Sequence, residues 1–358
     1  MDISKIDKNL TVEAIGDVEL EFRPYGAYPF RLHGAIVENG VITRLPREVG
    51  LATSQRVAGC ATLLAGARIR FRTNSSRVAI KYTVPWRNLM PHMAPSGSYG
   101  FDLYADDFDG RGEYFRGTFV PSFAKELEFE GMVKLWNHKM RDVTLNLPLY
   151  NGLSSLVIGL DPGAELLPAA DYRNPTPVVY YGSSITQGGC ASRPGNCYEA
   201  LLSRRLGTDF LCLGFSGSAQ GEDAIREYIS GLDMSAFVLD YDHNAPTLEH
   251  LAATHYKMYE AVRAAHPNIY IIMLSRPKFY ISSLEAQRRD LIRETYERAL
   301  AAGDTRVRFI DGNTIFPPDV RDDATVDGCH PTDLGFYFMA GAIEPHLREA
   351  LEIYESEK

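Results

Sequence analysis

The first half of the chain alternates apolar and polar residues over short runs. Residues 67–72 read Ala-Arg-Ile-Arg-Phe-Arg, with a period of two, and turn residues such as Thr73–Ser76 separate this run from the next. A period of two places successive side chains on opposite faces of a strand. Residues 1 to about 170 are therefore predicted to form an antiparallel β-sandwich or jelly roll without a long helix. The expected strands cover residues 67–72, 78–82, 100–104, 143–147 and 155–158.

From Val178 the pattern changes to apolar runs that alternate with longer mixed segments. Residues 269–274 are apolar throughout, as in a strand buried on both faces, and Gly207 is placed to end a helix. Strands that alternate with helices predict a parallel sheet covered by helices on both sides. The expected strands are 178–181, 209–213, 236–241, 269–274 and 306–310, and the expected helices are about 196–206, 221–231, 247–265, 283–302 and 332–354.

The proline-rich segment from Asp161 to Pro177 is the expected connection between the two halves, because its prolines oppose regular structure. We therefore predict two domains, a β-rich domain over residues 1–170 and an α/β domain over residues 171–358.

Composition excludes several classes of partner. The net charge of −9 and the pI near 5.5 argue against nucleic acid and anionic membranes. No stretch approaches the roughly 20 apolar residues that span a bilayer. The first seven residues lack the basic start and apolar run of a signal peptide, so we expect a cytoplasmic protein. The odd number of cysteines agrees with that, and Cys190 and Cys197 are expected to be free thiols rather than a disulfide.

Two segments carry the residues of a nucleophilic serine. Ser184 comes just after the strand expected at 178–181, where a sharp turn can expose its hydroxyl. In Asp327-x-x-His330 one turn can carry a carboxylate and an imidazole to the same side. A serine needs a base within hydrogen-bond reach, and the base needs a partner that fixes its tautomer. Either segment alone is more often structural, but their positions after the first and last strands favour a joint role.

A serine nucleophile also needs donors for the charge that develops on the substrate's carbonyl oxygen. A glycine in the segment 213–218, after the second strand, can bring its N–H close to a substrate, and Asn244, after the third strand, can donate through its amide. The alternative for both segments is ordinary turn chemistry.

Together these blocks resemble the SGNH, or GDSL-type, hydrolase family. The resemblance implies a flavodoxin-like five-stranded parallel sheet in the α/β domain, with Ser184 as nucleophile, His330 as base and Asp327 as its acid partner. It also implies an oxyanion hole made of the N–H groups of Ser184 and Gly217 and the side chain of Asn244. Two positions depart from the family pattern: Ser183 replaces the usual aspartate before the nucleophile, and Asp242–Asn244 replaces Gly-x-Asn-Asp. The β-rich half ahead of such a domain resembles the arrangement in carbohydrate esterases.

We accordingly expect a serine esterase that acts through an acyl-enzyme, without cofactor or catalytic metal, on small acyl groups, above all acetyl, carried by a carbohydrate. The accessory β-domain and the lack of a long apolar lid favour a hydrated substrate. The alternatives are a lysophospholipase or thioesterase on the same fold, and a carbohydrate-binding protein with an inactive hydrolase domain. Sequence leaves the oligomeric state open.

Three further features of the sequence are candidate sites. Asp240, Asp242 and His243 could bind a metal, but nothing completes the ligand shell. His250 and His255 lack the spacing of a helical zinc pair and are expected to be packed or solvated. Trp86 lies in an apolar loop, where core packing is the first interpretation and stacking on a sugar the alternative.

Overall fold

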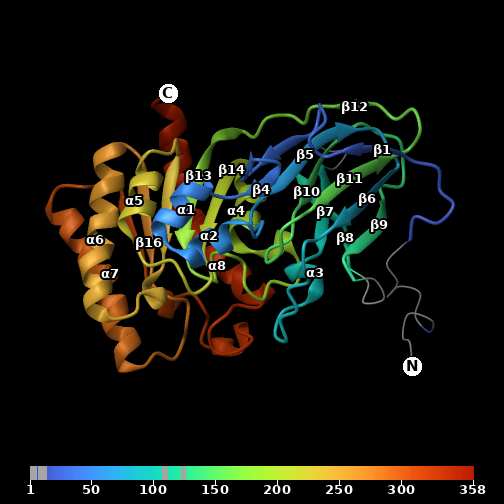
Figure 1. The fold of residues 1–358 in the computed structure, drawn as a ribbon. Helices are drawn as coiled ribbons and strands as arrows, with labels where there is room; N and C mark the ends of the chain where they lie inside the picture. The colour runs from blue at the N-terminus through green and yellow to red at the C-terminus, as the bar shows by residue number, and fades with distance from the viewer. Residues whose placement is uncertain (1–5, 7–13, 107–111, 122–125) are drawn as a thin grey trace.

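The computed structural model describes residues 6, 14–106, 112–121 and 126–358, and its two halves lie end to end (Figure 1). The expectation for residues 1–7 falls, apart from Ile6, outside the described residues. The β-sheets of the first half occupy one end of the molecule, and the helix-covered sheet of the second half occupies the other (Figure 1).

Two antiparallel sheets form the first half, as predicted. One has the order β1 (Glu21–Pro24), β11 (Ser155–Leu160), β6 (Arg77–Thr83) and β9 (Glu128–Lys134). The other has the order β12 (Leu166–Leu167), β5 (Arg68–Thr73), β10 (Arg141–Asn146), β7 (Phe101–Asp106) and β8 (Glu113–Phe119), and β2 (Arg31–His33) also pairs with β5. Alternate residues such as Phe71, Leu103 and Ile158 point into one shared core, which explains the period of two.

The second half contains a parallel sheet with the order β14 (Thr208–Gly214), β13 (Asn174–Gly182), β15 (Ala236–Asp240), β16 (Tyr270–Leu274) and β17 (Val307–Ile310). This is the predicted flavodoxin-like order. Helices α4 (Tyr198–Leu206) and α8 (Asp333–Ser356) share one apolar core with residues such as Val178 and Val238. Helices α5 (Asp223–Ser230), α6 (Leu248–Ala265) and α7 (Ser283–Ala301) share the other with Val179 and Leu239. Because neighbouring strand residues enter different cores, the strands are apolar throughout. Gly207 ends α4 in the left-handed conformation, as predicted.

The structure corrects two sequence expectations. Strand β13 begins at Asn174, ahead of Pro175 and Pro177, although prolines were expected to oppose regular structure there. The pairing with β14 shifts register between Asn174 and Val178, so both prolines occupy an irregular stretch that needs few ladder N–H groups. The first half also contains a hairpin and three short helices that the alternation did not reveal: β3 (Ile36–Glu38), β4 (Val41–Thr43), α1 (Arg47–Thr53), α2 (Gln55–Ala61) and α3 (Pro95–Ser98).

A buried arginine joins the two halves near the end of β14. Arg44 is 1% exposed, and its guanidinium donates to the carbonyl oxygens of Cys212 and Gly214, each at 2.8 Å. It also donates to the carbonyl oxygens of Cys60 and Leu63 in the first half. Five donors in a fixed plane allow one side chain to satisfy carbonyls from both halves. The segment that follows Gly214 is therefore anchored from the first half.

No helix among the described residues has both the length and the apolar character needed to cross a membrane.

Candidate active site

The topology of the parallel sheet brings the sequence blocks to one edge. Strands β14, β13 and β15 are neighbours and run in the same direction, so the segments that follow them meet beyond their carboxyl ends. Ser184 follows β13, Gly217 follows β14 and Asn244 follows β15. Asp327 and His330 lie between a 3-10 turn at Arg321–Ala324 and α8.

Ser184, His330 and Asp327 form a continuous hydrogen-bonded chain. The Oγ of Ser184 lies 2.8 Å from Nε2 of His330, and Nδ1 of His330 lies 2.8 Å from Oδ2 of Asp327. Oδ1 of Asp327 accepts the backbone N–H groups of Cys329 and His330. The carboxylate therefore fixes both the turn and the ring, and with Nδ1 protonated, Nε2 can accept the serine proton.

The turn that carries Asp327 and His330 is closed by backbone contacts. A β-bridge joins Thr325 to Pro331, and the N–H of Val326 donates to the carbonyl oxygen of His330 at 2.8 Å. The side chain of Thr332 then caps α8 by accepting the N–H of Gly335. The Asp-x-x-His segment thus forms a tight loop that ends at a capped helix.

The charges of this turn are coupled. Two groups raise the pKa of His330 to about 9, although partial burial lowers it. The adjacent Cys329 thiol contributes most, and the Asp327 carboxylate contributes less. Burial opposes ionisation of Asp327, but hydrogen bonds from the N–H and ring of His330 outweigh it and hold the pKa of Asp327 at about 2. The same imidazole, with Arg276, lowers the pKa of the Cys329 thiol against the effect of burial.

The two neighbouring serines face different surroundings. Ser183 is fully buried; its Oγ accepts the N–H of Ile185, and its N–H donates to the carbonyl oxygen of Asp240. Ser184 is 7% exposed and directs its hydroxyl at His330. Ser183 therefore supports the turn, and of the two only Ser184 meets the imidazole.

Three groups near Ser184 are able to donate to an oxyanion. Among the described residues, none accepts a hydrogen bond from the backbone N–H of Ser184 or of Gly217. Gly217 has φ +63°, which favours glycine, and a Cβ there would meet no atom within 4 Å. The side-chain amide of Asn244 donates to the carbonyl oxygen of Phe215 at 3.2 Å and keeps a second hydrogen. The assignment of these three groups to an oxyanion hole stays a prediction.

The loop with Gly217 is tied to the nucleophile block by Gln187. The side-chain oxygen of Gln187 accepts the N–H of Ser216 at 2.8 Å. Gly214 packs so tightly against the backbone of Gln187 that a Cβ would lie 2.3 Å from its nitrogen. These contacts hold the two segments at a fixed separation, as a preorganised donor set requires.

The first half also reaches Ser184, through residues that sequence patterns did not reveal. The hydroxyl of Tyr150 donates to the backbone carbonyl of Ser184 at 3.3 Å. The loop that carries Trp86 is pinned by Asn151, whose amide donates to the carbonyl oxygen of Trp86 at 2.7 Å. Six residues further on, the ring of His92 lies 5.9 Å from the ring of His330, between centroids.

Trp86 itself is 44% exposed, so its interpretation as a core residue is wrong. Contact between Trp86 and a substrate stays a prediction. No sequence signal marked Tyr150 or His92, because each reaches the site only through tertiary contacts with residues far along the chain.

The remaining sequence candidates have structural partners. Asp240, Asp242 and His243 do converge, with one ligand atom each within 4.8 Å of the others. Both oxygens of Asp242 are already engaged, by the ring and N–H of His243 and by the N–H of Arg276. His250 and His255 are packed as expected. The His250 ring is hydrogen-bonded to the carbonyl oxygen of Gln220, and the His255 ring is hydrogen-bonded to the Thr295 hydroxyl. Cys190 and Cys197 are free thiols, as predicted.

Comparison with known families divides the chain in two. Residues 175–348 match the GDSL-like lipase/acylhydrolase family. Residues 22–166 match a family described as the N-terminus of SGNH-hydrolase-type esterases. No curated protein matches the chain.

Solved structures share the whole architecture. A protein from Bacteroides ovatus, assigned as a GDSL-like lipase, is 28% identical, with a TM-score of 0.84 over 93% of this chain and 98% of its own. A salicylyl-acyltransferase from a tetracycline biosynthetic pathway is 19% identical, with a TM-score of 0.75 over 92% and 97%. An acetyl xylan esterase from the rumen bacterium Butyrivibrio proteoclasticus is 13% identical, with a TM-score of 0.57 over 93% and 99%. The last two show likeness of fold.

Proposed function

The chain belongs to the SGNH (GDSL-like) lipase/acylhydrolase family and is a carboxylic ester hydrolase, and from this premise we propose that Ser184 is its nucleophile and that small acyl esters of carbohydrates are its substrates. The single observation that carries the proposal is the chain of two 2.8 Å contacts from Ser184 through His330 to Asp327. A serine, an imidazole and a carboxylate in that order are the parts that acyl transfer needs.

The reaction proceeds in two steps. Ser184 gives its proton to Nε2 of His330 as its Oγ attacks the ester carbonyl, and the oxyanion is held by Ser184, Gly217 and Asn244. His330 then protonates the leaving alcohol, which leaves an acyl group on Ser184. Water attacks this acyl-enzyme with His330 as base, and the acid is released. Each oxyanion donor is commonly worth about 3 kcal/mol in the transition state.

Asp327 acts through His330 rather than on the substrate. Its carboxylate accepts the Nδ1 proton, keeps Nε2 free to accept from Ser184 and stabilises the imidazolium that forms. The low pKa of Asp327, about 2, keeps this charge present throughout the pH range of an assay.

Two features favour a carbohydrate ester. The accessory β-rich half reaches the site at Tyr150 and His92, so it is able to shape the space beside Ser184. The acetyl xylan esterase named above combines the same two-part fold with a sugar-acetate substrate. The proposal includes an accessory domain over residues 1–170 and a catalytic domain over residues 171–358. It also places the protein in the cytoplasm.

A chain-length series separates the proposal from its rivals. With p-nitrophenyl esters, kcat/KM should fall steeply beyond acetyl, and a screen of acetylated oligosaccharides should yield released acetate. A preference for long acyl chains would instead favour a lysophospholipase or thioesterase. Absence of turnover on every ester, with retained oligosaccharide binding, would favour a binding protein with an inactive hydrolase domain.

A further inference from the structure

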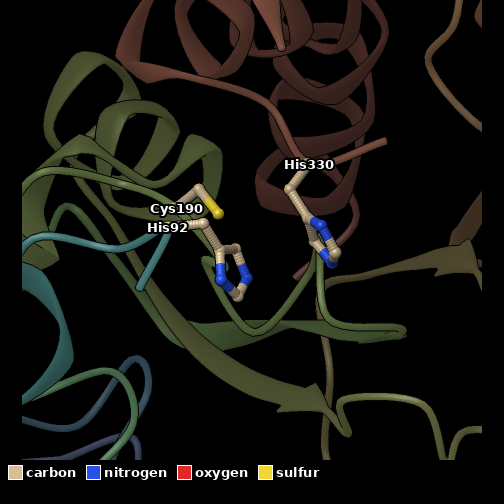
Figure 2. A group of neighbouring side chains, drawn as sticks. All are labelled: His92, Cys190 and His330. Atoms are coloured by element: carbon tan, nitrogen blue, oxygen red, sulfur yellow. The ribbon is translucent and has the colours of Figure 1, made fainter. Parts of the chain in front are cut away.

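Three metal-ligating side chains converge beside the nucleophile. His92, Cys190 and His330 each offer one ligand atom, and these atoms all lie within 4.8 Å of one another. Figure 2 shows Cys190 and His92 side by side, with the ring of His330 across from them. The three come from separate segments: the loop before α3, the loop after Ser184, and the turn before α8.

This set matches the preferences of zinc. Two imidazole nitrogens and one thiolate sulfur are ligands that Zn²⁺ accepts, at roughly 2.0–2.1 Å and 2.3 Å. A tetrahedral ion with such bonds keeps its ligand atoms about 3.5 Å apart. The atoms need to approach by only about 1 Å, and the exposed His92 side chain has room to turn.

The backbone that carries Cys190 is held firmly. Cys190 has φ +73°, a conformation that costs energy for any residue other than glycine and persists only when its surroundings impose it. On its N-terminal side, the N–H of Gly189 donates to the carbonyl oxygen of Ser184 at 2.8 Å. On the other, the N–H of Ala191 donates to the carbonyl oxygen of Gly188. The thiol is buried, yet directed at the site.

The loop that carries His92 is fastened to the same segment. The hydroxyl of Ser96 donates to the carbonyl oxygen of Ser192 at 2.6 Å, and Met93 is buried in the core beside α8. Gly97 packs so closely on Ala191 that a Cβ would lie 2.1 Å from its carbonyl oxygen. The segment that follows His92 is therefore fastened to the segment that follows Cys190.

We propose that His92, Cys190 and His330 form an inhibitory site for Zn²⁺, which binds Nε2 of His330 and so removes the catalytic base. Nδ1 of His330 is occupied by Asp327, which leaves Nε2, the nitrogen that faces Ser184. The Cys190 thiol loses its proton to solvent as the sulfur–metal bond forms, and the Ser184 hydroxyl or water takes the fourth position. Binding is independent of the proposed function, whereas inhibition rests on it. This site is distinct from a metal requirement for turnover.

Two other groups of potential ligands are less suitable. In the set Asp327, Cys329 and His330, the carboxylate already accepts three hydrogen bonds from the same turn. In the set Asp240, Asp242 and His243, Asp242 is paired with the His243 ring. A metal at either place would have to break an existing interaction that holds the fold, whereas at the proposed site it replaces one hydrogen bond to Ser184.

The first test is inhibition by ZnCl₂ with p-nitrophenyl acetate. Zinc should inhibit the wild-type enzyme and EDTA should restore the rate. Cys190→Ser and His92→Ala should each raise the inhibition constant by at least about tenfold, since even the loss of a partner that only orients a metal ligand costs that much. The control His138→Ala, a surface histidine, should leave the inhibition constant unchanged, and Cys329→Ser should not raise it. Equal inhibition of wild type and Cys190→Ser, or its loss in Cys329→Ser, would overturn the proposal.

The second test measures binding without activity. Co²⁺ added to Ser184→Ala should give a near-ultraviolet sulfur-to-cobalt absorption band, which should vanish in Ser184→Ala/Cys190→Ser. A band without zinc inhibition of the wild type would leave the metal site intact and refute the proposed role of His330. Inhibition without a band would show that zinc acts elsewhere and overturn the site. Melting temperatures of all variants exclude unfolding as the cause.

Discussion

Cys329 raises the pKa of His330, and replacing Cys329 by serine should therefore move the pH dependence of catalysis. The thiol is the largest contributor to the raised pKa of His330, about 9. Serine keeps the size of the side chain but does not ionise in this range. The proposed mechanism needs neutral His330, so kcat/KM should be low below this pKa and rise as pH increases through it.

The magnitude follows from the two pKa values. With a pKa of about 9, only about 1% of His330 is neutral at pH 7. At the ordinary value near 6.5 the neutral fraction would be about three quarters. Asp327 also raises the pKa of His330 and stays in place, so the serine variant should recover part of this difference. We expect the ascending limb to move to lower pH by about one pH unit, and kcat/KM at pH 7 to rise about tenfold.

The assay is kcat/KM for p-nitrophenyl acetate from pH 5.5 to 10, in buffers that contain EDTA, with correction for spontaneous hydrolysis. Cys190→Ser is the matched control, because burial raises the pKa of the Cys190 thiol to about 12 and keeps it neutral over most of this range. Its limb should coincide with that of the wild type. A wild-type midpoint near 6.5 would contradict the raised pKa of His330, and identical limbs for Cys329→Ser and wild type would contradict the role of Cys329.

Three further substitutions probe separate parts of the site. Asn244→Ala should lower kcat about 10²–10³-fold with little change in KM, because the amide acts on charge present only in the transition state; a change confined to KM would make Asn244 a binding residue. Gly189→Ala should lower kcat about 10- to 100-fold, since the added Cβ would lie 2.9 Å from the Ser184 carbonyl oxygen and 3.2 Å from Cδ2 of His330. The control Gly231→Ala should leave kcat unchanged, because its Cβ would have no neighbour closer than 3.5 Å. Trp86→Ala should raise KM for an acetylated oligosaccharide and spare p-nitrophenyl acetate, and equal losses on both would show that Trp86 serves the fold.

Much of the second half could be predicted because its signals are local. The apolar run at 269–274 became β16, and the glycine after Leu206 ends α4 in the left-handed conformation. Ser184, Asp327 and His330 were found from short motifs, because the order of parallel strands fixes where those motifs meet. The expectation from Pro175 and Pro177 was wrong, because a proline disrupts a strand only where the ladder needs an N–H donor at its position, and here the pairing shifts register across both prolines.

The remainder of the site could not be predicted because it depends on contacts between distant segments. His92 meets His330 across more than two hundred residues, and Cys190 meets His92 only because Gly97 and Ser96 fasten one loop to the other. Neither residue carries a local pattern. Helices α1 and α2 were missed for a related reason: each has seven residues, too few for a clear helical period.

The proposed mechanism depends above all on Ser184 as the residue that carries the acyl group. The most direct measurement is to treat the protein with a serine-directed fluorophosphonate, locate the adduct by peptide mass spectrometry, and compare wild type with Ser184→Ala and Ser183→Ala. We predict an adduct on Ser184, no adduct in Ser184→Ala together with a loss of kcat by several orders of magnitude, and labelling with substantial activity in Ser183→Ala. An adduct on Ser183, or full esterase activity in a correctly folded Ser184→Ala, would contradict the account.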